Sequence, residues 1–199
     1  MKPAASLLFA GLSLSQTTSP VAITSIALSG PGCPAASSPV IISRDGQSAH
    51  ISLSSFSVGS GPGTVPSNSC TFAISLLYSS ASTTCTATHF GFTYSGTGKV
   101  DEGLTGSLHD AFTVAPKGAI GPHLDPVFAW DSGTFGTAGQ VGPWSFASGF
   151  AVEVDDIKGS GEEIVLTGTA FMDSEVIEGK NGEVKTERIG ITIGGTGAC

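Results

Sequence analysis

Charged residues are scarce in this sequence. They make up 12% of the 199 residues, and the 8 lysines and arginines are outnumbered by 16 aspartates and glutamates. The resulting net charge of −8 repels phosphate backbones and anionic lipid headgroups. We therefore expect neither nucleic acid nor a membrane as a partner. Because 40% of the residues are hydrophobic, the chain is also too apolar for a disordered protein.

Motifs of catalysis and cofactor binding are missing as well. There is no Gly-x-Ser-x-Gly nucleophile elbow and no Cys-x-x-Cys pair, which disfavours triad hydrolysis, zinc ribbons and thioredoxin-type redox chemistry. The four histidines (His50, His89, His109 and His123) are scattered, and the acidic residues of 155–163 lack the spacing of a calcium loop. The sequence thus predicts no catalytic residue, no cofactor and no metal.

Glycine and proline are abundant instead, with 28 and 11 residues. They separate short runs in which apolar residues alternate with small or polar ones, the period of a half-buried strand. Residues 96–106 are expected to form a turn with a short strand, and Asp45-Gly46 is a hairpin signal. Strands are expected at 21–28, 40–42, 50–53, 71–78, 90–94, 107–114, 146–154, 164–172 and 189–193. This pattern predicts an all-β protein, an antiparallel β-sandwich of jelly-roll type.

The first residues have the pattern of a secretory signal peptide. Lys2 gives a positive start, residues 4–14 form a short apolar run, and Ser13-Leu14-Ser15 offers small residues before a cleavage site. The apolar run is too short to span a bilayer. We expect residues 1–15 to be removed and residues 16–199 to form one secreted, extracellular domain.

Four cysteines, Cys33, Cys70, Cys85 and Cys199, lie in that domain. An even number in an exported chain indicates disulfides, and two bridges can be paired in three ways. The sequence alone leaves the pairing open.

Several short motifs resemble a family of small secreted proteins, common in fungi, that is defined only as a domain of unknown function. They are an opening strand with Ile23-Thr24-Ser25-Ile26, then Gly30-Pro31-Gly32-Cys33-Pro34, Ser43-Arg44-Asp45-Gly46, Gly61-Pro62-Gly63, Asn68-Ser69-Cys70, Asp101-Glu102-Gly103-Leu104-Thr105-Gly106 and the closing Cys199. The family's Trp-Ser-Pro-Cys-Gly motif is replaced here by Trp144-Ser145-Phe146-Ala147-Ser148-Gly149. The resemblance implies secretion and a β fold, and it implies no activity. Cys85 is extra to the family pattern and the cysteine of the replaced motif is lost, so the pairs that we expect beside this resemblance are Cys33–Cys70 and Cys85–Cys199.

These observations favour a secreted, non-enzymatic binding or structural protein of the cell wall or extracellular space, of an effector-like kind. Its partner would be a cell-wall polysaccharide or a host or extracellular protein. The expected ligand contacts are Trp130, Asp131, Trp144, Asp101 and Glu102, because aromatic rings stack on sugars and acids bond their hydroxyls. The alternative is a small carbohydrate-active enzyme that uses carboxylates of residues 101–131.

Overall fold

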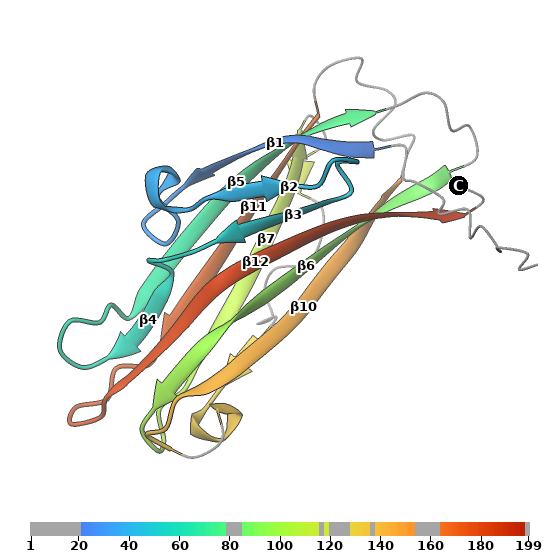
Figure 1. Cartoon of the computed structure of the whole chain (residues 1–199). Helices are drawn as coiled ribbons and strands as arrows, with labels where there is room; N and C mark the ends of the chain where they lie inside the picture. Colours follow the sequence, from blue (N-terminus) through green and yellow to red (C-terminus); the bar gives the residue numbers. More distant parts are fainter. Residues whose placement is uncertain are drawn as a thin grey trace, which may run out of the picture.

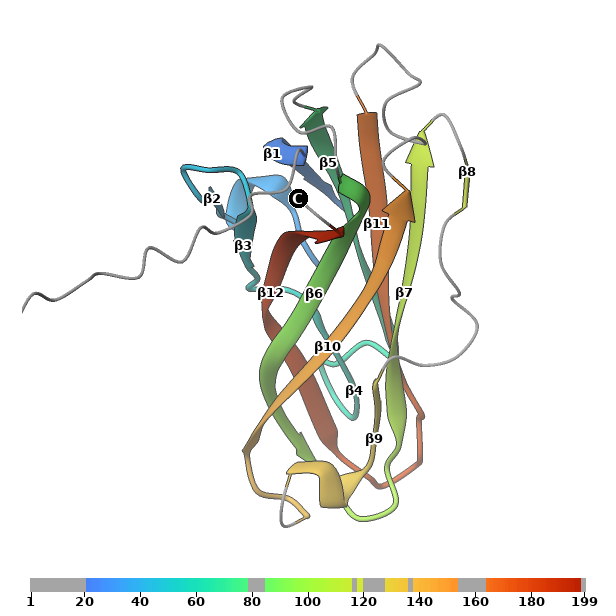
Figure 2. The same ribbon diagram turned by 90° about the vertical axis from the view of Figure 1, so that its right-hand side faces the viewer.

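The computed structural model describes residues 21–78, 85–115, 118–119, 128–135, 138–153 and 164–197. The signal peptide expected at residues 1–15 lies outside this part. Two six-stranded antiparallel sheets lie face to face and confirm the predicted sandwich (Figures 1 and 2). Within the described residues, no helix has the length and apolar character needed to cross a membrane.

The first sheet is built around three long strands that pair side by side. Its order is β1 (Val21–Ser29), β5 (Ser67–Tyr78), β11 (Ile164–Ser174), β7 (Gly106–Ala115) and β8 (Gly118–Ala119), with β9 (Phe128–Trp130) also paired to β7.

The second sheet has the longest strands of the described chain at its centre. Its order is β10 (Gly142–Glu153), β6 (Cys85–Val100), β12 (Gly182–Gly197), β3 (Ser48–Ser52) and β2 (Val40–Ile42), with β4 (Ser57–Ser60) also paired to β12. Two short 3-10 helices, η1 (Ala35–Ser37) and η2 (Ser132–Phe135), lie between strands.

The core lies between the two sheets and follows the predicted alternation of side chains. Its centre is a group of phenylalanines contributed by both layers. The ring centroids of Phe92 and Phe112 are 4.4 Å apart, and those of Phe112 and Phe150 are 4.8 Å apart. Phe72 joins them at 5.7 Å from Phe92. Such ring contacts stabilise the fold beyond the contribution of burying the rings. The inward-facing residues of the alternating strands thereby hold the two sheets together.

The strand β6 differs from the prediction, because it continues to Val100 where a turn was expected from residue 96. Gly96 and Gly98 suggested a turn, but both glycines make room for neighbours. A Cβ at Gly96 would collide with the carbonyl oxygen of Lys185, and one at Gly98 would collide with the ring of Phe135. Close approach of a neighbour is one of the uses of glycine inside a strand.

The predicted hairpin turn at Asp45-Gly46 joins β2 to β3. Gly46 has a φ of 70°, a conformation that glycine adopts at no steric cost. The Asp45 carboxylate accepts hydrogen bonds from the Ser43 hydroxyl at 2.6 Å and from the Gln47 amide at 3.0 Å. Both hydrogen bonds lower the pKa of Asp45, and the bond from Ser43 has the larger effect.

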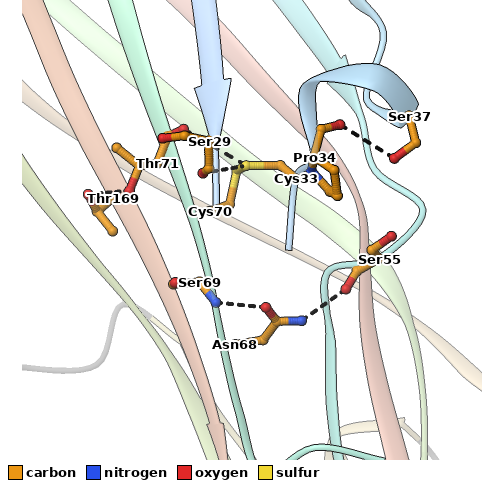
Figure 3. Close-up of a disulfide and its surroundings, with 10 residues drawn as sticks. All are labelled: Ser29, Cys33, Pro34, Ser37, Ser55, Asn68, Ser69, Cys70, Thr71 and Thr169. Atoms are coloured by element: carbon orange, nitrogen blue, oxygen red, sulfur yellow. Dashed lines mark hydrogen bonds between the residues drawn. A yellow bond between two sulfur atoms is a disulfide. The ribbon is translucent and has the colours of Figure 1, made fainter. Parts of the chain in front are cut away.

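A disulfide links the loop after β1 to β5 (Figure 3). Cys33 and Cys70 have their Cα atoms 5.2 Å apart, and neither side chain is exposed. Beside the bridge, the Asn68 side-chain amide donates to the carbonyl of Ser55 at 2.9 Å. The bridge between Cys33 and Cys70 confirms the first of the two expected pairs.

The second expected pair, Cys85–Cys199, cannot be followed in the same way. Cys85 begins β6 and pairs in register with Gly197 of β12. Cys199 lies outside the described residues.

Candidate functional site

A groove lies at one end of the sandwich, between strand ends and loops. It lies at the lower end in Figure 1, where β6, β12 and the loop after β4 meet, and its volume is about 600 Å³. We call it the end groove. Its lining consists of Ser60, Gly61, Pro62, Thr64, Thr97, Gly98, Lys99, Asp101, Val141, Asn181, Gly182, Glu183, Lys185 and Glu187.

The floor of the end groove is formed by the outward-facing residues of two paired strands. Lys99 of β6 lies opposite Glu183 of β12, and Thr97 lies opposite Lys185. Because side chains alternate across a strand, the residues next to these four along each strand face the core. Val100 and Val184 are accordingly buried. The sheet register therefore brings together polar groups that are far apart in the sequence.

One wall is the loop that follows β4. Gly61 has a φ of 114° and Gly63 a φ of 83°, which favours glycine at both positions. A Cβ at Gly61 would also collide with the Asn181 side chain. The Thr64 hydroxyl donates to the Gly61 carbonyl at 2.8 Å and closes the turn. The Gly-Pro-Gly sequence thus curls the loop against the connection between β11 and β12, two strands of different sheets.

The charged groups of the end groove include one ion pair. The Lys185 ammonium lies 3.3 Å from the Glu183 carboxylate, and the two side chains are 49% and 41% exposed. The Thr97 hydroxyl donates to the Glu187 carboxylate at 3.0 Å. Among the described residues, Lys99 has no ion-pair partner and its side chain is exposed. Exposed pairs of this kind contribute little to stability. Exchanging such a pair for contacts with a ligand would therefore cost little.

Asp101 is the one expected ligand contact that lines the end groove. Its amide donates to the Asn181 carbonyl at 2.9 Å, and its carboxylate accepts from the Asn181 amide at 2.8 Å. Glu102 is exposed beside the groove, and its backbone carbonyl accepts from the Lys180 ammonium at 2.6 Å. Asp101 therefore fixes Asn181, just before β12, where one wall of the groove lies.

Trp130 and Asp131 are not among the residues that line the end groove. The Trp130 side chain is 3% exposed, with its ring centroid 6.1 Å from that of Phe135. The Asp131 carboxylate accepts from the Thr134 amide at 2.9 Å, and the Thr134 hydroxyl accepts from the Asp131 amide at 3.1 Å. The structure thus gives Trp130 a packing role and makes Asp131 the N-terminal cap of η2.

Trp144 is 6% exposed and supports the groove from inside the sandwich. Its indole N–H donates to the Lys185 carbonyl at 3.1 Å, so it holds the strand that carries the groove's ion pair. No aromatic residue is among those that line the end groove. The stacking platform expected from the two tryptophans is therefore absent from this described site.

Most of the polar residues that line the groove were not predicted from the sequence, namely Thr97, Lys99, Glu183, Lys185 and Glu187. The signal that could have found them is the parity of β6 and β12. Once Phe92 and Tyr94 are placed in the core, Thr97 and Lys99 must face outward.

A second polar cluster is sealed in the core. The Asp110 carboxylate, on a residue that is 3% exposed, accepts from the Tyr94 hydroxyl at 3.1 Å and from the Ser148 hydroxyl at 2.6 Å. Burial raises the pKa of Tyr94 well above its usual value, and the Asp110 carboxylate raises it further. The cluster joins β7 of the first sheet to β6 and β10 of the second, out of reach of a ligand.

The histidines do not gather into a site in the described structure. His109 bonds the Ser107 hydroxyl at 2.8 Å, and His50 and His89 are exposed on different strands. His123 lies outside the described residues. Among the residues that were placed, no group of three or more histidines, cysteines or carboxylates is positioned to hold a metal ion.

Residues 19–120, just over half of the chain, match the family model described as a domain of unknown function, DUF4360. No curated protein matches the sequence significantly.

Proposed function

The chain belongs to the DUF4360 family, and from that premise we propose that it is a secreted, non-enzymatic protein that binds polysaccharide in the cell wall or extracellular space. The end groove is its binding site. The family description names no activity, so the proposal rests on the groove.

The observation that carries the proposal is the dense set of hydrogen-bonding groups in the end groove. Thr64, Thr97 and Asn181 supply hydroxyl and side-chain amide groups, and Lys99 supplies an uncommitted ammonium. A polysaccharide presents hydroxyl groups that both donate and accept, so it needs donors and acceptors in the same site. The two paired strands β6 and β12 and the bonded loops beside them hold these groups in place, which limits the entropy lost on binding.

The carboxylates of the groove support binding rather than catalysis. Asp101 accepts from a backbone amide, Glu183 pairs with a lysine, and Glu187 accepts from a threonine. Glycoside hydrolysis needs one carboxyl that stays protonated, usually through burial in an apolar pocket. Glu183 is 41% exposed and sits beside an ammonium, which is the opposite environment.

Hydrolysis remains the second candidate, because three carboxylates do converge on one groove. Asp101 belongs to the segment that suggested a carbohydrate-active enzyme, while Glu183 and Glu187 come from β12. An enzyme would need a pair of them to act on a bound sugar, so any release of soluble sugar must depend on them.

Export is supported by the disulfide between Cys33 and Cys70. Structural disulfides persist in oxidising compartments and are rare in reducing ones. Recovery of the oxidised protein from the medium of a secreting host, with residues 1–15 removed, would agree with the proposal. Retention inside the cells would contradict it.

The binding experiment is a pull-down on insoluble chitin, β-glucan and cellulose, with soluble sugar measured in the same tubes. We expect retention without sugar release, and a loss of retention in Lys99→Ala. The matched control is Arg188→Ala, which removes an exposed cation from the neighbouring strand β12 of the same sheet but outside the groove. Retention on none of the three polymers would contradict the proposal.

Released sugar would instead favour the enzyme. It should then disappear in Asp101→Asn, Glu183→Gln or Glu187→Gln, while binding persists. Asp131→Asn is the control, because that carboxylate lies outside the groove.

A further inference from the structure

The strand β10 forms a long open edge of the second sheet. It pairs with β6 in an unbroken register from Gly142 opposite Gly98 to Glu153 opposite Ala87. Among the described residues, no strand pairs with its other edge. Over the range 147–152, the described backbone bonds run to β6 alone. An edge of this kind is a template for pairing with another chain.

The other sheet edges are short or covered. The β1 edge is interrupted between Ile23 and Ser25, the Ile23 amide donates to the Gly46 carbonyl at 2.9 Å, and the Gln47 side chain donates to the Val21 carbonyl at 2.9 Å. The remaining edge strands β2, β4, β8 and β9 have three, four, two and three residues. Such short or covered edges resist pairing, so β10 is the exception.

The side chains along β10 also suit a neighbour. Phe146 and Phe150 pack against the core but stay partly exposed, and Ala147 and Ala151 are exposed on the outer face. The strand carries no charge from residue 142 to residue 152, although the chain has a net charge of −8. Two copies would therefore repel each other least along this edge.

We propose that β10 pairs with β10 of a second copy of this chain to form a symmetric dimer. Antiparallel pairing of a strand with itself is compatible with a twofold axis, the commonest symmetry of homo-oligomers. The pairing would satisfy backbone groups over Ala147–Val152 and cover the exposed edges of Phe146 and Phe150. It would join the two second sheets into one continuous sheet.

This dimer bears on the groove, in a consequence that rests on the proposed function. The twofold axis of an antiparallel strand pair runs perpendicular to the sheet, so the outer faces of both copies point the same way. Lys99 and Glu183 line the groove from that outer face. Both grooves would open on one side, which favours bivalent attachment to a polymer surface.

The test measures the mass of the full secreted protein by light scattering and sedimentation over a wide range of concentration. We expect the mass to double as concentration rises. The variant Ala147→Glu/Ala151→Glu places two like charges on each copy at the paired edge, so it should keep the monomer mass at concentrations where the natural sequence is dimeric. The control Ser25→Glu/Ala27→Glu adds the same charges at exposed positions on β1 and should still dimerise.

Hydrogen exchange identifies the interface independently of mutation. The amides of Ala147–Val152 should exchange more slowly in the dimer than in the monomer. A monomer at every concentration would overturn the proposal, and so would a dimer in which these amides gain no protection or which only the β1 variant disrupts. None of these readouts uses polysaccharide, so failure of the dimer is distinguishable from failure of the groove.

Discussion

Removing the disulfide between Cys33 and Cys70 should cost this fold a large part of its stability. The bridge closes a loop with a sequence separation of 37 residues. In the chain-entropy treatment, closing a loop of that length lowers the entropy of the unfolded chain enough to stabilise the fold by about 4 kcal/mol. We therefore expect Cys33→Ala/Cys70→Ala to lower the free energy of unfolding by that order. Alanine is the right replacement, because both positions are fully buried and a serine would add an unpaired hydroxyl.

The assay is urea denaturation followed by circular dichroism and tryptophan fluorescence, with the natural sequence measured before and after reduction. Trp130 and Trp144 are buried and report on packing at the groove end. The reduced natural protein should be at least as unstable as the double variant, because reduction also opens the expected Cys85–Cys199 bridge. A loss below about 1 kcal/mol would refute the reasoning, because it would mean that the loop is already restricted in the unfolded chain.

Three further results are expected. The free energy of unfolding should fall as the pH rises above about 10, the pKa of tyrosine in the unfolded chain, because burial raises the pKa of Tyr94 in the folded state. Tyr94→Phe should weaken this pH dependence in denaturation curves taken at several pH values, and an unchanged dependence would contradict the prediction. Gly168→Ala should lower the free energy of unfolding by about 1–3 kcal/mol, since the new Cβ would collide with Phe72; equal urea midpoints would count against this packing. Non-reducing peptide mapping should find Cys85 linked to Cys199, whereas free thiols there would contradict the expected pair.

The fold was largely readable from the sequence where alternation is strict. Phe72, Ile74 and Leu76 are buried as their period predicts, because one face of a sheet must enter the core. Asp45-Gly46 gave the turn because few residues adopt a positive φ there. The end of β6 was missed, since a glycine in a strand and a glycine in a turn look alike until the strand's neighbours are known.

The site was much harder to predict, for a physical reason. Asp101 was predicted as a carboxylate that could bond sugar hydroxyls, but Lys99 and Glu183 meet only through the register of β6 and β12. Trp130 and Trp144 were expected at the surface, and the structure buries both. Trp144 shares the parity of Phe146 and Phe150 in β10, which could have placed it in the core, whereas the three residues of β9 around Trp130 are too short a run to tell the inside from the outside.

The most direct test of the central claim is amide chemical-shift mapping of the secreted protein titrated with soluble chitin and β-glucan oligosaccharides. The account predicts shifts confined to residues 60–64, 97–101 and 181–187, the segments that line the end groove. It also predicts that Lys99→Ala weakens binding and that Arg188→Ala does not. Shifts centred elsewhere, or none at saturating oligosaccharide, would contradict the claim that this groove binds polysaccharide.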